Sequence, residues 1–206
     1  MGVVPEAVMQ TARLELRRFT PDDVDLIVAL DSDPAVMRYI TGGSATSRHE
    51  VVTEVLPAWL AYYEHSDHLG FFAAQERATG EFVGWFHFRP GAGRAAEEPE
   101  LGYRLRRTSW GSGLATEGSR ALIDHGFREH AVTRVDAETM VVNTASRRVM
   151  EKCGMRLVRY FHADWPVRIP GDEHGDVEYA ITRAEWAAST TLPDGQDGRS
   201  PRSRAT

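Results

Sequence analysis

Hydrophobic and polar residues change their spacing several times along the chain, and each change predicts a new element. From Thr11 to Arg18 the two classes alternate, which is typical of a half-buried strand. The segment Thr20-Pro21-Asp22-Asp23 then opens a helix, with a hydroxyl cap, an early proline and acids in the first turn. A second short helix is expected over 33–40, and a third over 47–64.

From Gly70 onward the apolar period becomes two, which indicates strands. Two aromatic-rich strands, 71–76 and 82–88, are joined by the hairpin connection Ala78-Thr79-Gly80. The remaining elements are expected to be a strand over 100–105, a helix over 114–129, a strand over 134–142, a helix over 144–153, and closing strands over 155–161 and 177–182. This order predicts a single α+β (mixed α/β) domain over residues 1–188. Residues 189–206 are rich in Pro, Gly, Ser and Arg, and we expect them to be disordered.

Composition narrows the class of protein. The 206 residues contain no apolar run of about 18, which excludes a membrane-spanning helix. Residues 1–10 lack the pattern of a secretion signal, and the formal charge of −6 argues against a nucleic-acid partner. The single cysteine, Cys153, excludes a disulfide framework, and we expect it to be a buried structural thiol. These features predict a cytoplasmic protein with no membrane contact.

The most informative segment is the glycine-rich turn over 108–117, Thr-Ser-Trp-Gly-Ser-Gly-Leu-Ala-Thr-Glu. It lies between a predicted strand and a predicted helix, where backbone N–H groups and the positive helix end can hold an anion. Gly111 and Gly113 permit positive φ and close approach of a ligand. The turn has no lysine, so it is not an ATP- or GTP-binding phosphate loop, and Thr116 breaks the dinucleotide fingerprint. Taken alone, the turn could equally be a structural connection.

Three motifs together change this interpretation. ELGYRL at 100–105, WGSGLATE at 110–117 and NTASRRVMEKCGM at 143–155 resemble, in this order, the GNAT acyltransferase superfamily. The chain is most similar to its ribosomal-protein alanine N-acetyltransferase (RimJ/RimL-like) branch, and the resemblance runs from TARLELRRF to EYAITRAEW. It implies a bacterial N-acetyltransferase that uses acetyl-CoA, with homodimerisation as a further possibility. The implied GNAT fold has a central, mostly antiparallel sheet of about seven strands with a splayed central pair and about four helices.

The resemblance also implies which residues contact acetyl-CoA. The backbone near Tyr103 pairs with the pantetheine, the glycine-rich turn cradles the pyrophosphate, Asn143 bonds the pantetheine near the thioester, and Ser146 faces the sulfur. The full set is Tyr103, Arg104, Leu105, Arg106, Trp110, Gly111, Ser112, Gly113, Leu114, Ala115, Thr116, Asn143 and Ser146.

Three positions depart from the family's pattern. Thr108 stands where the superfamily has Arg or Gln, so Arg106 or Arg107 is expected to supply that charge. Met150 replaces a tyrosine that many members carry, and it cannot act as a general acid. Met155 replaces the usual phenylalanine, which we interpret as a packing change.

Acetyl transfer from a thioester needs a neutral amine, a polarised carbonyl and a protonated leaving thiol. Ser146 is the candidate proton donor to the thiol, and its alternative role is to cap the helix. An α-amino group has a pKa near 7.7–8.0 against about 10.4 for lysine, so a site with one carboxylate suits an α-amine better. We choose Glu100 as that carboxylate, with Asp164 and Glu178 as alternatives.

Other features leave alternatives open. The histidines at 65, 68, 162 and 174 match no metal motif, so no metal is expected. The aromatic residues are assigned mostly to the core, and by resemblance some line the acceptor site: Trp59, Tyr62, Tyr63, Trp85, Phe86 and Phe88. The segment 162–176 is either a substrate lid or a dimer contact. The acceptor is a protein N-terminus or a small-molecule amine; the alternatives are a small cationic amine or antibiotic acetyltransferase, and a degenerate GNAT domain that binds acyl-CoA without catalysis.

Overall fold

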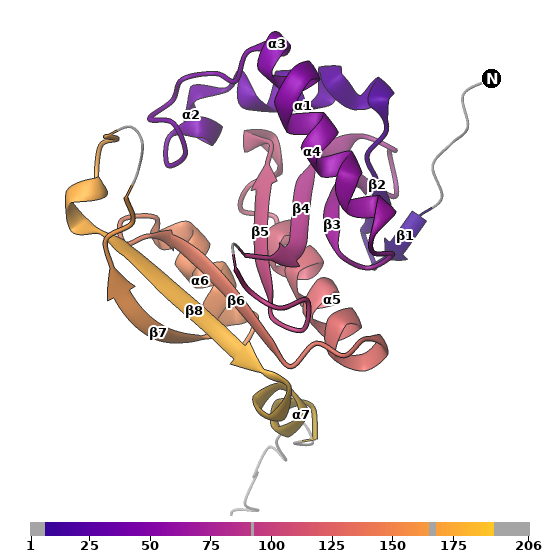
Figure 1. Cartoon of the computed structure of the whole chain (residues 1–206), viewed down its shortest axis with the longest axis vertical. Helices are drawn as coiled ribbons and strands as arrows, with labels where there is room; N and C mark the ends of the chain where they lie inside the picture. The colour runs from indigo at the N-terminus through magenta and orange to yellow at the C-terminus, as the bar shows by residue number, and fades with distance from the viewer. Residues whose placement is uncertain (1–6, 92, 165–167, 192–206) are drawn as a thin grey trace, which may run out of the picture.

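One eight-stranded sheet organises the described part of the chain (Figure 1). The computed structural model describes residues 7–91, 93–164 and 168–191. The spatial order is β1-β2-β3-β4-β5-β6-β8-β7, and every neighbouring pair is antiparallel except β5 and β6. The strands are β1 (Ala7–Gln10), β2 (Leu14–Arg18), β3 (Gly70–Glu76), β4 (Phe82–Pro90), β5 (Pro99–Leu105), β6 (Arg134–Met140), β7 (Arg156–Phe161) and β8 (Asp176–Thr182).

The two central strands diverge. Although β5 and β6 each have seven residues, their ladder contains one aligned pair, Glu100 with Asp136. Figure 1 shows β6 running obliquely to β5. Beyond Glu100 the backbone of β5 therefore has no strand partner on the β6 side, where the Trp110 indole N–H bonds the Leu105 carbonyl at 2.8 Å. The splayed pair expected from the sequence is confirmed.

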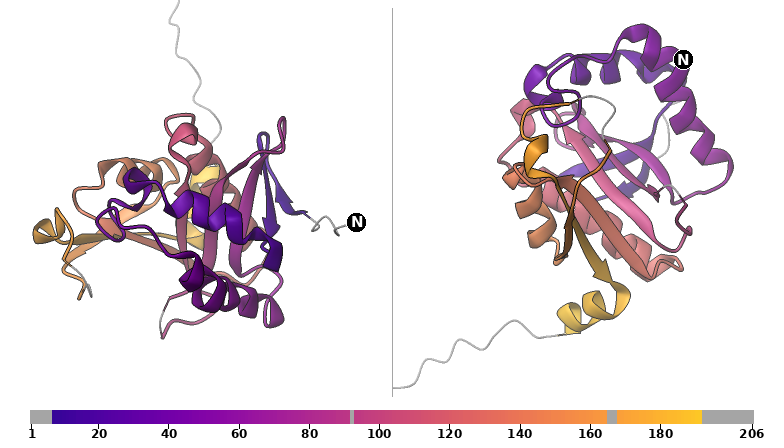
Figure 2. Two further views of the ribbon diagram at one scale, coloured as in Figure 1. Left: turned by 90° about the horizontal axis from the view of Figure 1, so that it is seen from above. Right: turned by 60° about the vertical axis from the view of Figure 1, so that its left-hand side comes forward.

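Helices lie on both faces of the sheet (Figures 1 and 2). The N-terminal helices α1 and α4 cover one face of β3 and β4, and α5 and α6 lie behind the sheet. The helices are α1 (Val24–Asp31), α2 (Pro34–Met37), α3 (Arg48–Glu50), α4 (Leu56–Ala61), α5 (Leu114–Glu129), α6 (Thr144–Lys152) and α7 (Arg183–Thr191), with short 3-10 turns at Pro21–Asp23, Tyr62–Glu64, Arg107–Ser109 and Asp172–His174. This arrangement confirms the mixed α+β class.

Local capping explains where the first helices begin. Thr20 stands at the expected cap position, and its N–H donates to Asp23 Oδ2 at 2.8 Å as in a capping box. Asp23 also pairs with Arg17 at 2.8 Å, and both side chains are buried. Asp33 accepts a hydrogen bond from the Ala35 N–H at 2.9 Å and so begins α2.

Three expectations about element bounds need correction. The sheet has β1 in addition to the expected strands, because Ala7–Gln10 pairs with β2 at the sheet edge although its alternation is too short to stand out. The expected helix over 47–64 changes winding, with a π-helical turn at Val51–Val55 directly before α4. Pro57 has no N–H to continue an α-helical ladder there. The expected tail also starts too early, since residues 189–191 belong to α7; residues 192–206 lie outside the described part.

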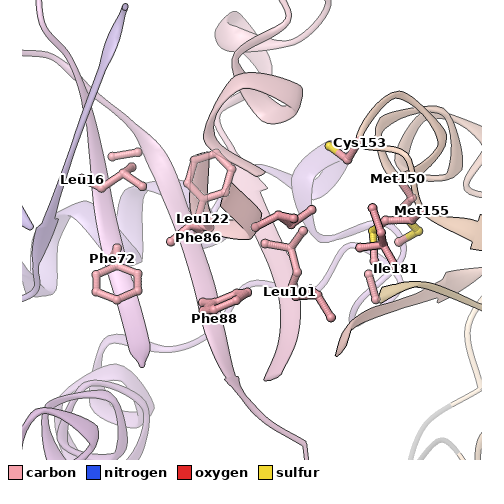
Figure 3. Close-up of a cluster of buried hydrophobic side chains, with 14 of the residues drawn as sticks. Leu16, Phe72, Phe86, Phe88, Leu101, Leu122, Met150, Cys153, Met155 and Ile181 are labelled. Carbon is pink, nitrogen blue, oxygen red and sulfur yellow. The ribbon is translucent and has the colours of Figure 1, made fainter. Parts of the chain in front are cut away.

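Two hydrophobic clusters hold the layers together. The larger one lies between the sheet and α5 and α6, and Figure 3 shows Phe86 beside Leu122, with Met150, Cys153, Met155 and Ile181 gathered at the far end. The smaller cluster lies under α1 and α4, where Trp59 stacks on Phe71 with ring centroids 4.4 Å apart. Among the described residues, no helix combines the length and the apolar character needed to cross a bilayer.

Candidate active site

A cavity of about 840 Å³ opens where β5 and β6 separate. Its lining comes from α2 and the residues after it, β4, β5, the glycine-rich turn with the start of α5, β6, α6, the end of β7 and the start of β8. The lining includes Glu100 and every residue predicted to contact acetyl-CoA except Arg106 and Ser112. Segments far apart in the sequence thus meet at one site.

Both glycines of the glycine-rich turn line this cavity. Gly111 and Gly113 have φ values of +72° and +86°, the left-handed region that favours glycine. The first helical hydrogen bond runs from the Glu117 N–H to the Gly113 carbonyl at 3.0 Å, so the preceding N–H groups at the start of α5 have no acceptor within the helix. A Cβ placed on Gly111 would meet no atom within 4 Å. The turn is therefore open at the point where an anion would approach.

The hydroxyl of Ser146 contacts the hydroxyl of Tyr103. The two oxygens are 3.0 Å apart, and burial raises the pKa of Tyr103 to about 12, so the phenol keeps its proton at neutral pH. The helix cap is Asn143 instead, whose Oδ1 accepts from the Ser146 N–H at 3.2 Å and whose Nδ2 donates to Thr139 Oγ1 at 3.1 Å. The alternative role of the Ser146 side chain as the helix cap is thus taken by Asn143.

Several cationic side chains lie near the turn, and Arg13 donates to the Ser112 carbonyl at 2.9 Å. Arg106 donates to the Phe82 carbonyl at 3.0 Å, and Arg107 lies 3.3 Å from Asp33. The cations that reach the cavity from α6 are Arg148 and Lys152, one helical turn apart. The backbone groups of the turn and these side chains together favour an anionic ligand.

The three candidate carboxylates lie in different environments. Glu178 is buried and is held by Arg134 and Arg159, each at 2.6 Å. Asp164 is exposed. Of the three, Glu100 is the one that lines the cavity, where burial acts to raise its pKa but the His87 ring and the Arg89 and Arg94 guanidiniums together hold that pKa below the ordinary value. Glu100 is therefore ionised at neutral pH.

His87 on β4 is the neighbour of Glu100 that the sequence patterns did not identify. Its Nε2 lies 3.6 Å from Glu100 Oε1, and the side chain lines the cavity. The signal was available: Trp85, His87 and Arg89 alternate with two phenylalanines, which puts a histidine on the face of the hairpin that looks toward Glu100. The Tyr103 hydroxyl was missed in the same way, because the resemblance assigned only its backbone.

The remaining residues named in the sequence analysis differ in burial. Trp59, Phe86 and Phe88 are buried in the core, Tyr62 and Tyr63 are partly buried, and Trp85 is buried and also lines the cavity. Cys153 is buried as expected, and burial raises its pKa to about 12, so its thiol is not nucleophilic at neutral pH. The described residues contain no His, Cys, Asp or Glu cluster that could hold a metal ion.

The irregular segment before β8 packs onto the rim of the cavity. Residues 165–167 lie outside the described part, but Ile169 is buried, and a Cβ placed on Gly42 would lie 3.2 Å from its Cγ2. Ala163 and Asp176, at the two ends of the segment, line the cavity. The described parts of the segment therefore border the cavity at both ends.

Comparison with known proteins identifies a family and several relatives that this chain resembles. The family model described as Acetyltransferase (GNAT) domain matches residues 13–156. The FsC-acetyl coenzyme A-N(2)-transacetylase of Aspergillus fumigatus is 34% identical over 194 residues, which is 90% of this chain and 80% of that protein. The uncharacterised protein YkkB of Bacillus subtilis is 33% identical over 146 residues, 70% of this chain and 83% of that one.

Solved structures share the fold. The ribosomal alpha-N-protein acetyltransferase RimL, solved with coenzyme A, has a TM-score of 0.71 at 20% identity, over 86% of this chain and 98% of its own. The aminoglycoside acetyltransferase AAC(6')-Ib, also solved with coenzyme A, has a TM-score of 0.68 at 18% identity, over 86% and 99%. With the family model covering most of the chain, this protein belongs to the GNAT acetyltransferase family.

Proposed function

We propose that this protein transfers the acetyl group of acetyl-CoA to the nitrogen of a primary amine in a ternary complex. The observation that carries the proposal is one continuous cavity, with free helix-start N–H groups at one end and an ionised carboxylate at the other. Coenzyme A in the solved structures of two relatives, and the N(2)-transacetylase name of a third, support the same chemistry.

The donor occupies the side of the cavity formed by the turn and α6. The pyrophosphate lies on the N–H groups around Gly111 and Gly113, and the pantetheine runs along the unpaired edge of β5. The thioester then lies beside Ser146, whose hydroxyl, backed by Tyr103, protonates the departing thiolate. The bond from carbon to sulfur breaks as the new bond from carbon to nitrogen forms.

The acceptor occupies the face that carries Glu100, the carboxylate on which removal of the ammonium proton depends. A single such carboxylate favours an α-amine over a lysine side chain, since the lysine amine costs roughly 3 kcal/mol more to keep neutral. The N(2) position in the name of the Aspergillus relative is consistent with an acceptor of this type. Either a peptide N-terminus or a small molecule with such an amine fits the proposal.

The second candidate is an acetyltransferase of small cationic amines. Glu138 and Asp176 join Glu100 in lining the cavity, and three carboxylates there attract positive charge. A panel of peptides, small α-amines, polyamines and aminoglycosides, assayed for CoA release from acetyl-CoA, separates the two candidates. Turnover with peptides or α-amines supports the first, and turnover confined to polycations supports the second. Binding of acetyl-CoA without turnover across the panel would contradict both and favour a degenerate acyl-CoA-binding domain.

A further inference from the structure

His87 has an environment that structural packing does not require. Its side chain is 11% exposed, and Nε2 is shut off from solvent with no hydrogen-bond partner in the described part of the chain. An imidazole in such a place costs free energy unless something uses it. The ring nevertheless lines the cavity beside Glu100.

The backbone fixes which edge of the ring meets the cavity. His87 pairs with Gly102 across β4 and β5, and a Cβ on Gly102 would lie 2.3 Å from His87 Nε2. Only glycine leaves room for the ring there. Because Nε2 points at Gly102 and at Glu100 Oε1, 3.6 Å away, Nδ1 is the nitrogen left for the cavity.

Burial, together with two nearby arginines, keeps the His87 ring uncharged at neutral pH. Burial is the largest cause that lowers the pKa of His87; Glu100 on β5 opposes this, and Arg89 and Arg104 add to it. The rings of Phe71 on β3 and Trp85 on β4, with centroids 5.4 and 5.9 Å away, are uncharged. The imidazole is thus neutral at neutral pH, while the carboxylate beside it is ionised.

Resting on the acetyl transfer proposed above, we propose that His87 is the catalytic base that takes the proton from the acceptor ammonium, and that Glu100 is its positioning residue. The negative charge of Glu100, 3.6 Å from Nε2, favours the proton on that nitrogen, which leaves the lone pair of Nδ1 toward the cavity. The N–H bond of the ammonium breaks and its proton binds Nδ1, and the freed nitrogen lone pair attacks the thioester carbon. After the C–S bond breaks, the thiolate receives the second nitrogen proton, relayed through Ser146, and the imidazolium releases its proton to solvent.

The alternation of β5 explains how this base and the thiol side are kept apart. Glu100 and Gly102 face the acceptor side, whereas Tyr103 faces α6 and contacts Ser146. The gap between β5 and β6 joins the two faces at the position of the thioester. Attack and departure therefore take place on opposite sides of one strand.

The kinetic test compares His87→Gln with a matched exposed histidine outside the cavity lining, His49→Gln. With the fastest basic amine of the panel, His87→Gln should lower kcat/KM by about 100-fold or more, the scale of general-base catalysis. With methoxyamine, which is neutral without help, the loss should be far smaller. His49→Gln should match the wild type with both acceptors. An equal loss with both amines would overturn the proposal, because a merely structural role does not distinguish them.

The pH profile adds a signature of its own. With His87 as base, wild-type kcat/KM for the basic amine should level off at a pH below 6.5, whereas in His87→Gln it should keep rising toward the pKa of the amine. Burial raises the pKa of Asp136, beside Glu100, to about 6, so Asp136→Asn is the control. If Asp136→Asn rather than His87→Gln changes the profile, the base is misassigned.

The protonation state of the His87 ring can be measured without any acceptor. Nitrogen NMR of the imidazole, assigned by its loss in His87→Gln, should show a neutral ring protonated on Nε2, and Glu100→Gln should change that signal. A ring that is charged at neutral pH or protonated on Nδ1 would overturn the proposal. Failure of the proposed function looks different: the wild type would release no CoA with any amine, whatever the state of His87.

Discussion

Substitution of Gly111 by alanine tests whether the turn holds the phosphates of acetyl-CoA. Gly111 has φ +72°, and a left-handed conformation costs an alanine about 1–2 kcal/mol. Gly80, in the turn between β3 and β4, has φ +74°, and neither glycine has an atom within 4 Å of its built Cβ. The two alanine variants should therefore lose the same stability, about 2–8 °C in melting temperature for a domain of this size.

Acetyl-CoA then separates the variants. At 100 times its Kd the ligand should add about 2.7 kcal/mol, hence about 5–10 °C, to the wild type and to Gly80→Ala. If the turn holds the pyrophosphate as proposed, the added methyl group of Gly111→Ala should hinder its approach to the N–H groups. A tenfold weaker Kd would reduce the stabilisation at the same concentration to about 1.4 kcal/mol.

Scanning calorimetry of the three proteins, with and without acetyl-CoA, measures both effects. An unchanged ligand shift in Gly111→Ala would refute the assignment of the turn as the phosphate site. Loss of the shift in Gly80→Ala as well would show that the left-handed strain acts through the whole fold. A wild type that does not respond to acetyl-CoA would remove the donor assignment altogether.

The other predictions concern the thiol side, packing and pH. Ser146→Ala should lower turnover by about 100-fold with little change in acetyl-CoA affinity, and Tyr103→Phe should lower it less; steady-state kinetics with unchanged turnover would leave Ser146 without a catalytic part. Gly118→Ala should cost about 1–3 kcal/mol in urea unfolding despite its better helix propensity, because its Cβ would lie 2.3 Å from an aromatic carbon of β4, and a more stable variant would contradict this packing. Burial lowers the pKa of His68 and His130, whose rings stack with centroids 3.6 Å apart, so the unfolded chain binds more protons than the folded one. The unfolding free energy of the wild type should therefore fall as pH drops below about 6.5, and a variant with both histidines replaced by Gln should lose less. The same pH dependence in the variant and the wild type would contradict this.

The element types were predictable because the signals were local. Alternation, capping and turn residues placed nearly every strand and long helix within a few residues. The errors lie where the decisive information is not local. The strand β1 forms only by pairing with Leu14–Arg18, and the change of winding before Pro57 depends on where that proline falls in the helix. The parallel pairing of β5 with β6, which α5 separates in the sequence, likewise depends on tertiary contacts.

The two halves of the site differ in predictability for a physical reason. In the proposed donor half the phosphates lie on backbone groups of a contiguous turn, so a short pattern such as WGSGLATE specifies that part of it. The acceptor half is made of side chains from β4, β5, β6 and β8, whose neighbours are set by strand register. The pair of His87 and Glu100 arises only when β4 folds back on β5 and Gly102 leaves space for the ring. A substitution that shifts this register would change the acceptor chemistry while the donor motif stays intact. Relatives that share the glycine-rich turn are therefore expected to share acetyl-CoA and to differ in the amine they acetylate.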